Sequence, residues 1–224
     1  MPQRKVPLVN NEYYHVFNRS INKEPIFVKN KDCQRVINTL EYYRFEEFPI
    51  RLSYFLALGV DRRQDIMQSL IATSRRVVDI ISFVIMPNHF HFLLRQGTDG
   101  GISKFLALIQ NSYTKYFNNK HTRQGHLFQG QFKSVRVEDD EQLLHINRYI
   151  HLNPYTSFII KSPEELESYP YSSFHEYINR GSVWLCDTEA ILSHFASRAA
   201  YKKFVFDQAD YQRKLEVVKH LILE

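Results

Sequence analysis

Two adjacent apolar runs at residues 77–95 constrain the fold of this chain more than any other part of its sequence. The first run, residues 77–86, is strongly apolar and rich in β-branched side chains, so we expect a buried strand there. Pro87 and Asn88 interrupt the apolar pattern, and residues 89–95 continue it as a second strand. Any fold for this chain has to accommodate this pair.

The other elements follow from local patterns. Residues 13–19 and 132–137 have the composition and alternation of strands. The spacing of apolar residues predicts helices over residues 31–45, 52–74, 102–119 and 140–152, the last of them ended by Pro154. The order β-α-β-β-α-β-α is typical of an α+β fold, and we expect a ferredoxin-like antiparallel sheet with helices packed on one side.

The C-terminal part of the chain differs from the rest in its local sequence pattern. After residue 161, Ser-Pro, Tyr-Pro and Ser-Ser steps punctuate the sequence, and short helices are predicted at about residues 188–198 and 201–223. We therefore expect a main domain over residues 1–180 and a small helical C-terminal extension over residues 181–224.

Composition excludes several classes of protein. Hydrophobic residues make up 44% of the 224 residues, which suits a packed core rather than disorder. No apolar run reaches the roughly 18 residues that a membrane-spanning helix needs, and the first residues lack the apolar segment of a secretory signal. Two distant cysteines form neither a disulfide framework nor a cysteine-based zinc site. A cytoplasmic protein without a membrane partner is expected.

The net charge of +5 is concentrated in residues 100–137, a stretch without any Asp or Glu. Its six cations are Lys104, Lys115, Lys120, Arg123, Lys133 and Arg136. Six aromatic residues are interleaved with them: Phe105, Tyr113, Tyr116, Phe117, Phe128 and Phe132. Cations that hold phosphates and rings that stack on bases favour a groove for single-stranded nucleic acid. The alternative is an amphipathic helix with core aromatics and a solvated basic face.

The most specific polar feature is the pair His89 and His91 in the second strand of residues 77–95. Residues two apart in a strand point to the same face, so both imidazoles project together while Phe90 and Phe92 point into a core. Two imidazoles on one face can bind one metal ion. A bare His-x-His pattern is more often structural, but polar side chains in an otherwise apolar strand favour a functional role.

Residues 149–153 offer the partners that such a site needs. Tyr149 and Asn153 are four apart and share one face of the predicted helix. The amide oxygen of Asn153 is a hard ligand for Mg²⁺ or Mn²⁺, and two histidines favour Mn²⁺ somewhat. The phenol of Tyr149 could serve as a nucleophile, although a lone tyrosine in a chain with 14 of them is usually a core residue.

An ordered set of motifs resembles the REP-associated tyrosine transposases, relatives of the insertion-sequence transposases in the HUH endonuclease class. The motifs are Tyr-His-Val-Phe-Asn-Arg at 14–19, Met-Pro-Asn-His-Phe-His at 86–91, Tyr-Thr-Lys-Tyr-Phe-Asn at 113–118, Gly-His-Leu-Phe-Gln-Gly-Gln-Phe-Lys-Ser at 125–134, and Tyr-Ile-His-Leu-Asn-Pro at 149–154. The resemblance covers about residues 10–180. Residues 52–74 depart from it, because they look longer than the link usual in the family.

The resemblance implies a function and a site. His89, His91 and Asn153 would hold Mg²⁺ or Mn²⁺, and Tyr149 would attack the scissile phosphate to leave a 5′-phosphotyrosine. The partner would be single-stranded or hairpin DNA, and the location the cytoplasm, on the nucleoid. Together with the basic stretch, this predicts the following DNA-binding residues: Asn18, Arg19, Lys104, Tyr113, Lys115, Arg123, Gln124, His126, Gln129, Lys133, Arg136 and Arg148.

Three other functions remain open at this point. A rolling-circle replication or relaxase-like initiator would use the same chemistry for another purpose. A non-catalytic nucleic-acid-binding module would not need Tyr149, and a metal-dependent hydrolase without a covalent step would cleave without it. The sequence leaves open whether the protein is a monomer or a homodimer.

Overall fold

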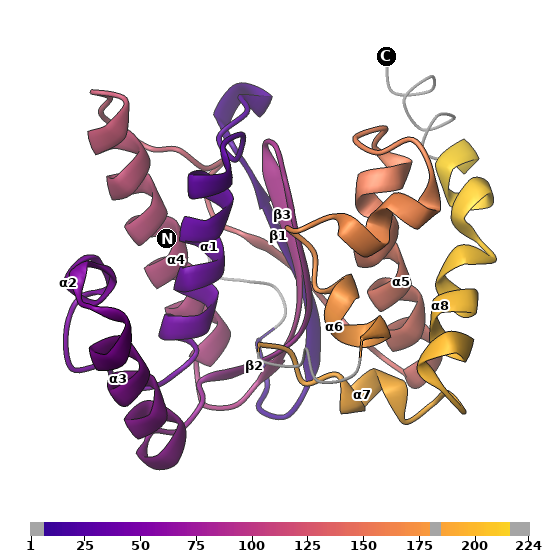
Figure 1. Ribbon diagram of the computed structural model, residues 1–224, viewed down its shortest axis with the longest axis horizontal. Coiled ribbons are helices and arrows are strands. Elements are labelled where there is room, and N and C mark those ends of the chain that lie inside the picture. Colours follow the sequence, from indigo (N-terminus) through magenta and orange to yellow (C-terminus); the bar gives the residue numbers. More distant parts are fainter. Residues whose placement is uncertain (1–6, 180–184, 216–224) are drawn as a thin grey trace.

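The computed structural model describes residues 7–179 and 185–215, and in them a four-stranded antiparallel sheet lies between two layers of helices (Figure 1). The strands are β1 (Tyr13–Arg19), β2 (Val78–Met86), β3 (His89–Gln96) and β4 (Lys133–Arg136). Their order across the sheet is β2-β3-β1-β4, that of a ferredoxin-like sheet. The predicted α+β fold class is therefore confirmed.

Strands β2 and β3 form the predicted hairpin, with Met86 paired to His89 across the turn of Pro87 and Asn88. Strand β1 pairs with β3 on one side and with β4 on the other. The outer edge of β2 is covered by the C-terminal part of the chain, where Val84 forms a bridge to Ser172. Neighbouring strands are thus drawn from distant parts of the sequence.

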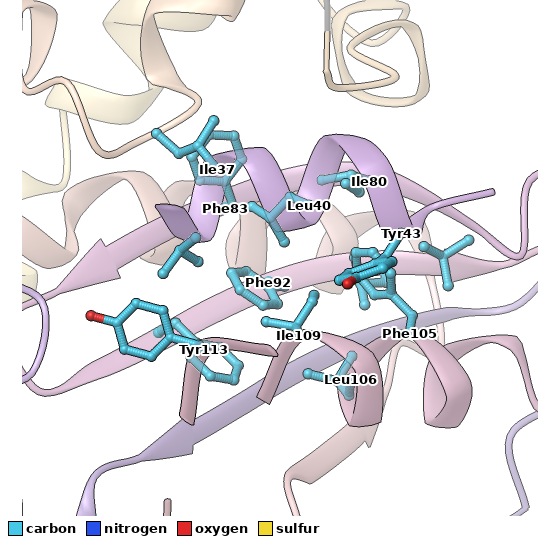
Figure 2. Close-up of a cluster of buried hydrophobic side chains, with 14 of the residues drawn as sticks. Ile37, Leu40, Tyr43, Ile80, Phe83, Phe92, Phe105, Leu106, Ile109 and Tyr113 are labelled. Atoms are coloured by element: carbon cyan, nitrogen blue, oxygen red, sulfur yellow. The ribbon is translucent and has the colours of Figure 1, made fainter. Parts of the chain in front are cut away.

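Helices α1 (Asn30–Tyr43) and α4 (Gly101–Lys120) cover one face of the sheet and contact each other. Their apolar side chains form a cluster with Phe90 and Phe92 of β3, as the alternation of that strand predicts. Figure 2 shows Phe92 amid this cluster, near Ile109 of α4. Two further helices, α2 (Leu52–Ala57) and α3 (Val60–Thr73), lie outside this layer (Figure 1).

The opposite face is covered by α5 (Asp140–Thr156), α6 (Phe174–Ile178) and α8 (Arg198–Phe206), with the short α7 (Glu189–Leu192) beside them (Figure 1). A second apolar cluster joins them to Val84 and Leu93 of the sheet. The prediction of helices on one side is therefore wrong, since it holds only for α1 and α4. The physical reason is in β2, where nearly every residue is buried, so both faces of this strand need a cover.

Two helix boundaries also differ from the predictions. The predicted helix over residues 52–74 is split by Leu58 and Gly59 into α2 and α3. Pro154 does not end α5, which continues to Thr156. Proline has no backbone N–H, so the helix lacks one hydrogen bond at this position. Short 3₁₀ helices occupy Ile21–Lys23 and Pro163–Ser168.

In the C-terminal part, the structure contains α7 and α8 where short helices were predicted. Their side chains share the second apolar cluster with α5 and the sheet. The predicted boundary at residue 180 and the last residues of the predicted helix 201–223 lie outside the described residues. Within the described ranges, no helix combines the length and the apolar character that crossing a bilayer requires.

Gly101, at the start of α4, provides a test of this packing. A Cβ atom at this position would lie 2.1 Å from the carbonyl oxygen of Val77, a backbone atom that leads into β2. We expect Gly101→Ala to lower the free energy of unfolding by about 1–3 kcal/mol, the usual cost of overpacking, in urea denaturation. Gly59→Ala is the matched control, because a Cβ there would meet nothing within 4 Å. Equal stability of the two variants would contradict the close approach.

Candidate active site

Histidine side chains from two neighbouring strands lie on the sheet face that α5 covers. In the β1–β3 pairing, Arg19 is opposite His89 and Phe17 is opposite His91, so these four side chains project to the same face. The rings of His89 and His91 have centroids 5.1 Å apart and stand edge to face at 89°. The strand alternation therefore orients both imidazoles as the sequence indicates.

Helix α5 brings Tyr149 to these histidines. The helix begins after Asp139, whose carboxylate accepts a hydrogen bond of 2.7 Å from the backbone N–H of Gln142, as a helix N-cap does. Nearly three turns later, at about 3.6 residues per turn, the ring of Tyr149 stands edge to face with His91, with centroids 5.5 Å apart at 86°. Residues some 60 positions apart in the chain thus meet in one place.

Asn153 lies one turn further along α5 and is buried. Its side-chain oxygen accepts a hydrogen bond of 3.4 Å from the hydroxyl of Ser157, within the end of the same helix. This oxygen is also the atom that would coordinate a metal ion. The role of Asn153 as a ligand remains a prediction.

A third histidine, His15 of β1, belongs to the same group and was not among the predicted site residues. Its Nε2 atom lies 2.9 Å from Nδ1 of His91. Its ring is also edge to face with Tyr149, with centroids 5.9 Å apart at 73°. The signal in the sequence was the strand alternation of Tyr13, His15 and Phe17, but only the pairing of β1 with β3 places His15 beside His91.

The second ring of the pair, His89, is held by the turn that precedes it. Its Nδ1 atom lies 2.6 Å from the side-chain oxygen of Asn88. The amide nitrogen of Asn88 donates in turn to the carbonyl oxygen of Lys23 at 3.0 Å. This second bond orients the amide, so its oxygen faces His89 and His89 Nδ1 is the donor.

Burial keeps the imidazoles of His15 and His91 neutral. It lowers the pKa of His15 to about 4. It also lowers the pKa of His91 well below the ordinary value, and the nearby charges of His15, His89 and Arg19 act in the same direction. A neutral imidazole has a free lone pair on one nitrogen, which is the form that binds metal ions.

The donor set suits a divalent metal ion that accepts both nitrogen and oxygen. His89 and His91 supply two imidazoles on one face, and Asn153 would supply an amide oxygen. Among the described residues, no three His, Cys, Asp or Glu side chains are grouped to hold a metal ion. The remaining ligands would therefore have to be oxygen atoms from amides, water or a substrate phosphate.

Several predicted DNA-binding residues gather beside the histidines. Arg19 is exposed and pairs with His89, and Lys133 of β4 is exposed and pairs with Phe17, so both lie on the face of the site. The backbone N–H of Gln129 donates to the carbonyl oxygen of Arg19 at 2.9 Å. The structure thus places two cations on the sheet face that carries the histidines, with an exposed loop at the end of β1.

Asn18 and the predicted residues of the loop before β4 lie close to this end of β1. The side-chain amide of Asn18 is buried and donates to Gln110 and to the carbonyl oxygen of Gly130. Arg123 donates to the side chain of Asn118 and to the carbonyl oxygen of His126. The side chains of Gln124 and His126 are exposed.

The other predicted DNA-binding residues lie apart from the histidines. Lys104 and Lys115 are exposed on α4, in the opposite helix layer. Arg136 forms an ion pair with Glu12 at 2.9 Å. Arg148 is buried against α8, where it donates to the carbonyl oxygen of Phe204 and stacks over its ring.

Tyr113 is a core residue, which corrects its prediction as a DNA contact. Its side chain is fully buried in the apolar cluster (Figure 2). Its hydroxyl donates to the carbonyl oxygen of Ile26. Phe105 is likewise fully buried in the same cluster. For these aromatics the plain alternative, an amphipathic helix with an apolar face, is the one that the structure contains.

Residues 59–153 match the family model described as the IS200-like transposase. This segment extends from α3 into α5 and includes His89, His91, Tyr149 and Asn153. This segment is therefore similar to the IS200-like transposases. The resemblance to transposases that the sequence motifs indicate is therefore confirmed. Strand β1, with His15, precedes the matched segment.

A solved structure supports the same fold. The chain is similar to a REP-associated tyrosine transposase whose structure was solved bound to a REP hairpin. The TM-score is 0.52 at 16% sequence identity, over 84% of this chain and 93% of that chain. No curated protein matches the chain.

A buried polar network holds α5 close behind Tyr149. His151 is fully buried, with Nδ1 2.6 Å from the hydroxyl of Tyr201 and Nε2 2.8 Å from the hydroxyl of Ser173. The Tyr201 hydroxyl donates to the side-chain oxygen of Asn147 at 2.6 Å, so it accepts from His151 Nδ1–H. The network therefore ties α5 to both α6 and α8 around a neutral imidazole.

This network predicts a loss of stability in acid. Burial lowers the pKa of His151 to about 3, whereas the unfolded chain titrates near the ordinary value of 6.5. Between these values the unfolded state binds more protons, so stability falls as the pH drops below 6.5. The contribution of His151 is on the order of 2 kcal/mol by pH 5.

Urea denaturation at pH 7 and pH 5 measures this effect. In His151→Gln the difference between the two pH values should shrink, although the variant is less stable at both. His194→Gln, at an exposed position, is the control and should keep the wild-type difference. An unchanged difference in His151→Gln would contradict the assignment.

Proposed function

We propose that the protein is a metal-dependent DNA endonuclease and strand transferase. It binds hairpin or single-stranded DNA on the nucleoid, and it cleaves and rejoins a strand through a 5′-phosphotyrosine at Tyr149. The observation that carries this proposal is the position of Tyr149 directly beside His91 and His15. The IS200-like transposase match over residues 59–153 supports it.

The covalent step follows from the residues of this chain. The phenolic oxygen of Tyr149 attacks the scissile phosphorus and loses its proton to solvent. The bond from phosphorus to the phenolic oxygen forms while the bond to the 3′-oxygen breaks, and that oxygen takes up a proton as a free 3′-hydroxyl. Attack of a 3′-hydroxyl on the phosphotyrosine reverses the step, so strands can be joined without an external energy source.

His89, His91 and Asn153 would hold the divalent ion, with Mn²⁺ or Mg²⁺ as candidates. Such an ion, when bound, polarises the scissile phosphate and stabilises negative charge on its oxygens. Burial keeps His91 neutral, and hydrogen bonds at Nδ1 orient both imidazoles, which suits them as ligands. Their attachment to one rigid strand keeps the ligand atoms in place beside Tyr149.

Binding of a nucleic acid is supported by the charges around the site. Arg19 and Lys133 are exposed on the face of the sheet that carries the histidines. Both can contact phosphates on either side of a strand that crosses the site. The similar solved structure is of a transposase bound to a REP hairpin, which supports a hairpin as the form of DNA.

Tyr149→Phe tests the covalent step. With a labelled hairpin oligonucleotide and Mn²⁺, wild-type protein should form a protein–DNA band that survives denaturation, and Tyr149→Phe should form none, because the attacking oxygen is removed. His89→Ala should lose both the adduct and the dependence on metal. Gel electrophoresis under denaturing conditions measures the adduct.

Tyr54→Phe is the matched control, because Tyr54 is 65% exposed on α2, away from the site, and should form the adduct as wild type does. Cleavage that persists in Tyr149→Phe would indicate a hydrolase without a covalent step. DNA binding without any cleavage in the wild-type protein would instead indicate a non-catalytic binding module. Either result would overturn the proposal.

Arg19→Ala and Lys133→Ala test the path of the DNA. Each substitution should weaken hairpin binding several-fold and lower the slope of log K against log salt by about 0.7–0.9, the value for one phosphate contact. Fluorescence anisotropy at several salt concentrations measures both quantities. Arg75→Ala is the control, because Arg75 is exposed near the start of β2, at the end of the sheet away from His89. Equal losses in all three variants would show that the effect of charge is not local.

A further inference from the structure

We infer that His15 is a positioning residue for the metal site: through its hydrogen bond it holds His91 in the tautomer whose Nε2 atom can bind the ion. This inference rests on the proposed function, because it assigns a role to a neighbour of a proposed ligand. His15 lies in β1, before the segment that matches the transposase family model.

The geometry of the contact is that of a direct hydrogen bond between two rings. The atoms His15 Nε2 and His91 Nδ1 are 2.9 Å apart, and the ring planes are within 24° of parallel. The centroids are 5.1 Å apart, which is nearly the N–N distance plus the two ring radii. The line between the nitrogens therefore passes close to both ring centres.

This contact decides which nitrogen of His91 can bind a metal ion. Nδ1 is engaged with His15, so Nε2 is the ring atom available for coordination. A neutral imidazole carries one proton, and a nitrogen that binds a metal ion must be unprotonated. The proton of His91 is therefore on Nδ1, from which it is donated to Nε2 of His15.

The other proposed ligand is held in the same manner by a different side chain. His89 Nδ1 donates to the side-chain oxygen of Asn88, whose amide is oriented by its bond to Lys23. In both His89 and His91 the Nδ1 atom is thus the hydrogen-bond donor, and Nε2 is the atom that would coordinate the ion. A hydrogen bond to the second ring nitrogen of a ligand histidine sets the orientation of the ring and raises its basicity.

His15 is itself positioned by the sheet. It pairs with Leu93 of β3, two residues after His91. Phe17, two residues after His15 in β1, contacts the ring of His91 at a centroid distance of 5.6 Å. His15 and Phe17 therefore both flank His91, but it is His15 that accepts the hydrogen bond from His91 Nδ1. This difference gives a matched pair for separating the hydrogen bond from simple packing.

Binding of Mn²⁺ to the protein without DNA, followed by electron paramagnetic resonance, tests the role of the hydrogen bond. His15→Phe keeps the ring but removes the acceptor, and should weaken Mn²⁺ binding about 10–100-fold. His15→Gln places an amide oxygen near the position of Nε2 and should restore most of the affinity. Phe17→Leu changes only packing and should bind Mn²⁺ within about threefold of wild type, well short of the loss that follows removal of an outer hydrogen bond.

The tautomer of His91 is a second readout, which needs neither metal nor catalysis. Nitrogen-15 NMR of the metal-free protein should show His91 with a protonated Nδ1, and His15→Phe should change the balance between its two tautomers. A wild-type His91 protonated on Nε2 would overturn the inference. So would equal Mn²⁺ affinity in His15→Phe and Phe17→Leu, or nitrogen couplings to Mn²⁺ that assign His15 as a direct ligand.

Failure of this inference can be told apart from failure of the proposed function. Wild-type protein that forms the Tyr149 adduct with hairpin DNA, together with unchanged Mn²⁺ affinity in His15→Phe, would remove only the role of His15. Wild-type protein that binds no Mn²⁺ would overturn both the metal site and the role of His15. The adduct assay on Tyr149→Phe then decides whether the covalent chemistry remains.

Discussion

Helix α5 packs across the sheet face that carries His15, His89 and His91, and the candidate site exists only because of this packing. Apolar side chains of α5, such as Leu143 and Ile150, bury themselves against Val84 and Leu93 of β2 and β3. Burial of a side chain of this size stabilises a fold by about 1.5–3 kcal/mol. The same contact that covers the apolar face therefore sets the distance between the phenol on the helix and the imidazoles on the strand.

Apolar contacts are not directional, so they do not by themselves fix the position of α5 along the sheet. The buried polar network around His151 fixes this position. Both ring nitrogens of His151 have partners, one on α8 and one on the segment that leads into α6. A buried polar group left without a partner costs about 1–3 kcal/mol, so this arrangement is specific to one position of the helix. The helices after residue 185 are thereby connected to the position of Tyr149.

Hydrogen bonds also fix the orientation of the imidazoles of His89 and His91. Asn88 and His15 each engage one Nδ1 atom, and they come from the hairpin turn and from β1, two parts of the chain that meet only in the sheet. Rings held by such partners lose little freedom when a ligand is bound, which favours binding. The apolar core on the opposite face, formed by α1 and α4, supports the strands but contributes no side chain to the histidine group.

Local periodicity was enough to predict much of the fold and which of the candidate site residues share a face. The β2–β3 hairpin, the common face of His89 and His91, and the common face of Tyr149 and Asn153 follow from the two-residue and 3.6-residue repeats of strands and helices. The order of the elements was enough for the ferredoxin-like sheet. These features depend on neighbours along the chain, which the sequence determines by itself.

Only the tertiary structure decided the rest. The contact of His15 with His91 joins residues 76 positions apart and depends on the register between β1 and β3. Three other features likewise depend on which surfaces meet: the burial of Tyr113, the second layer of helices and the contact of Arg148 with α8. A repeat in the sequence shows which side chains share a face, but long-range pairing and packing decide what each face is placed against.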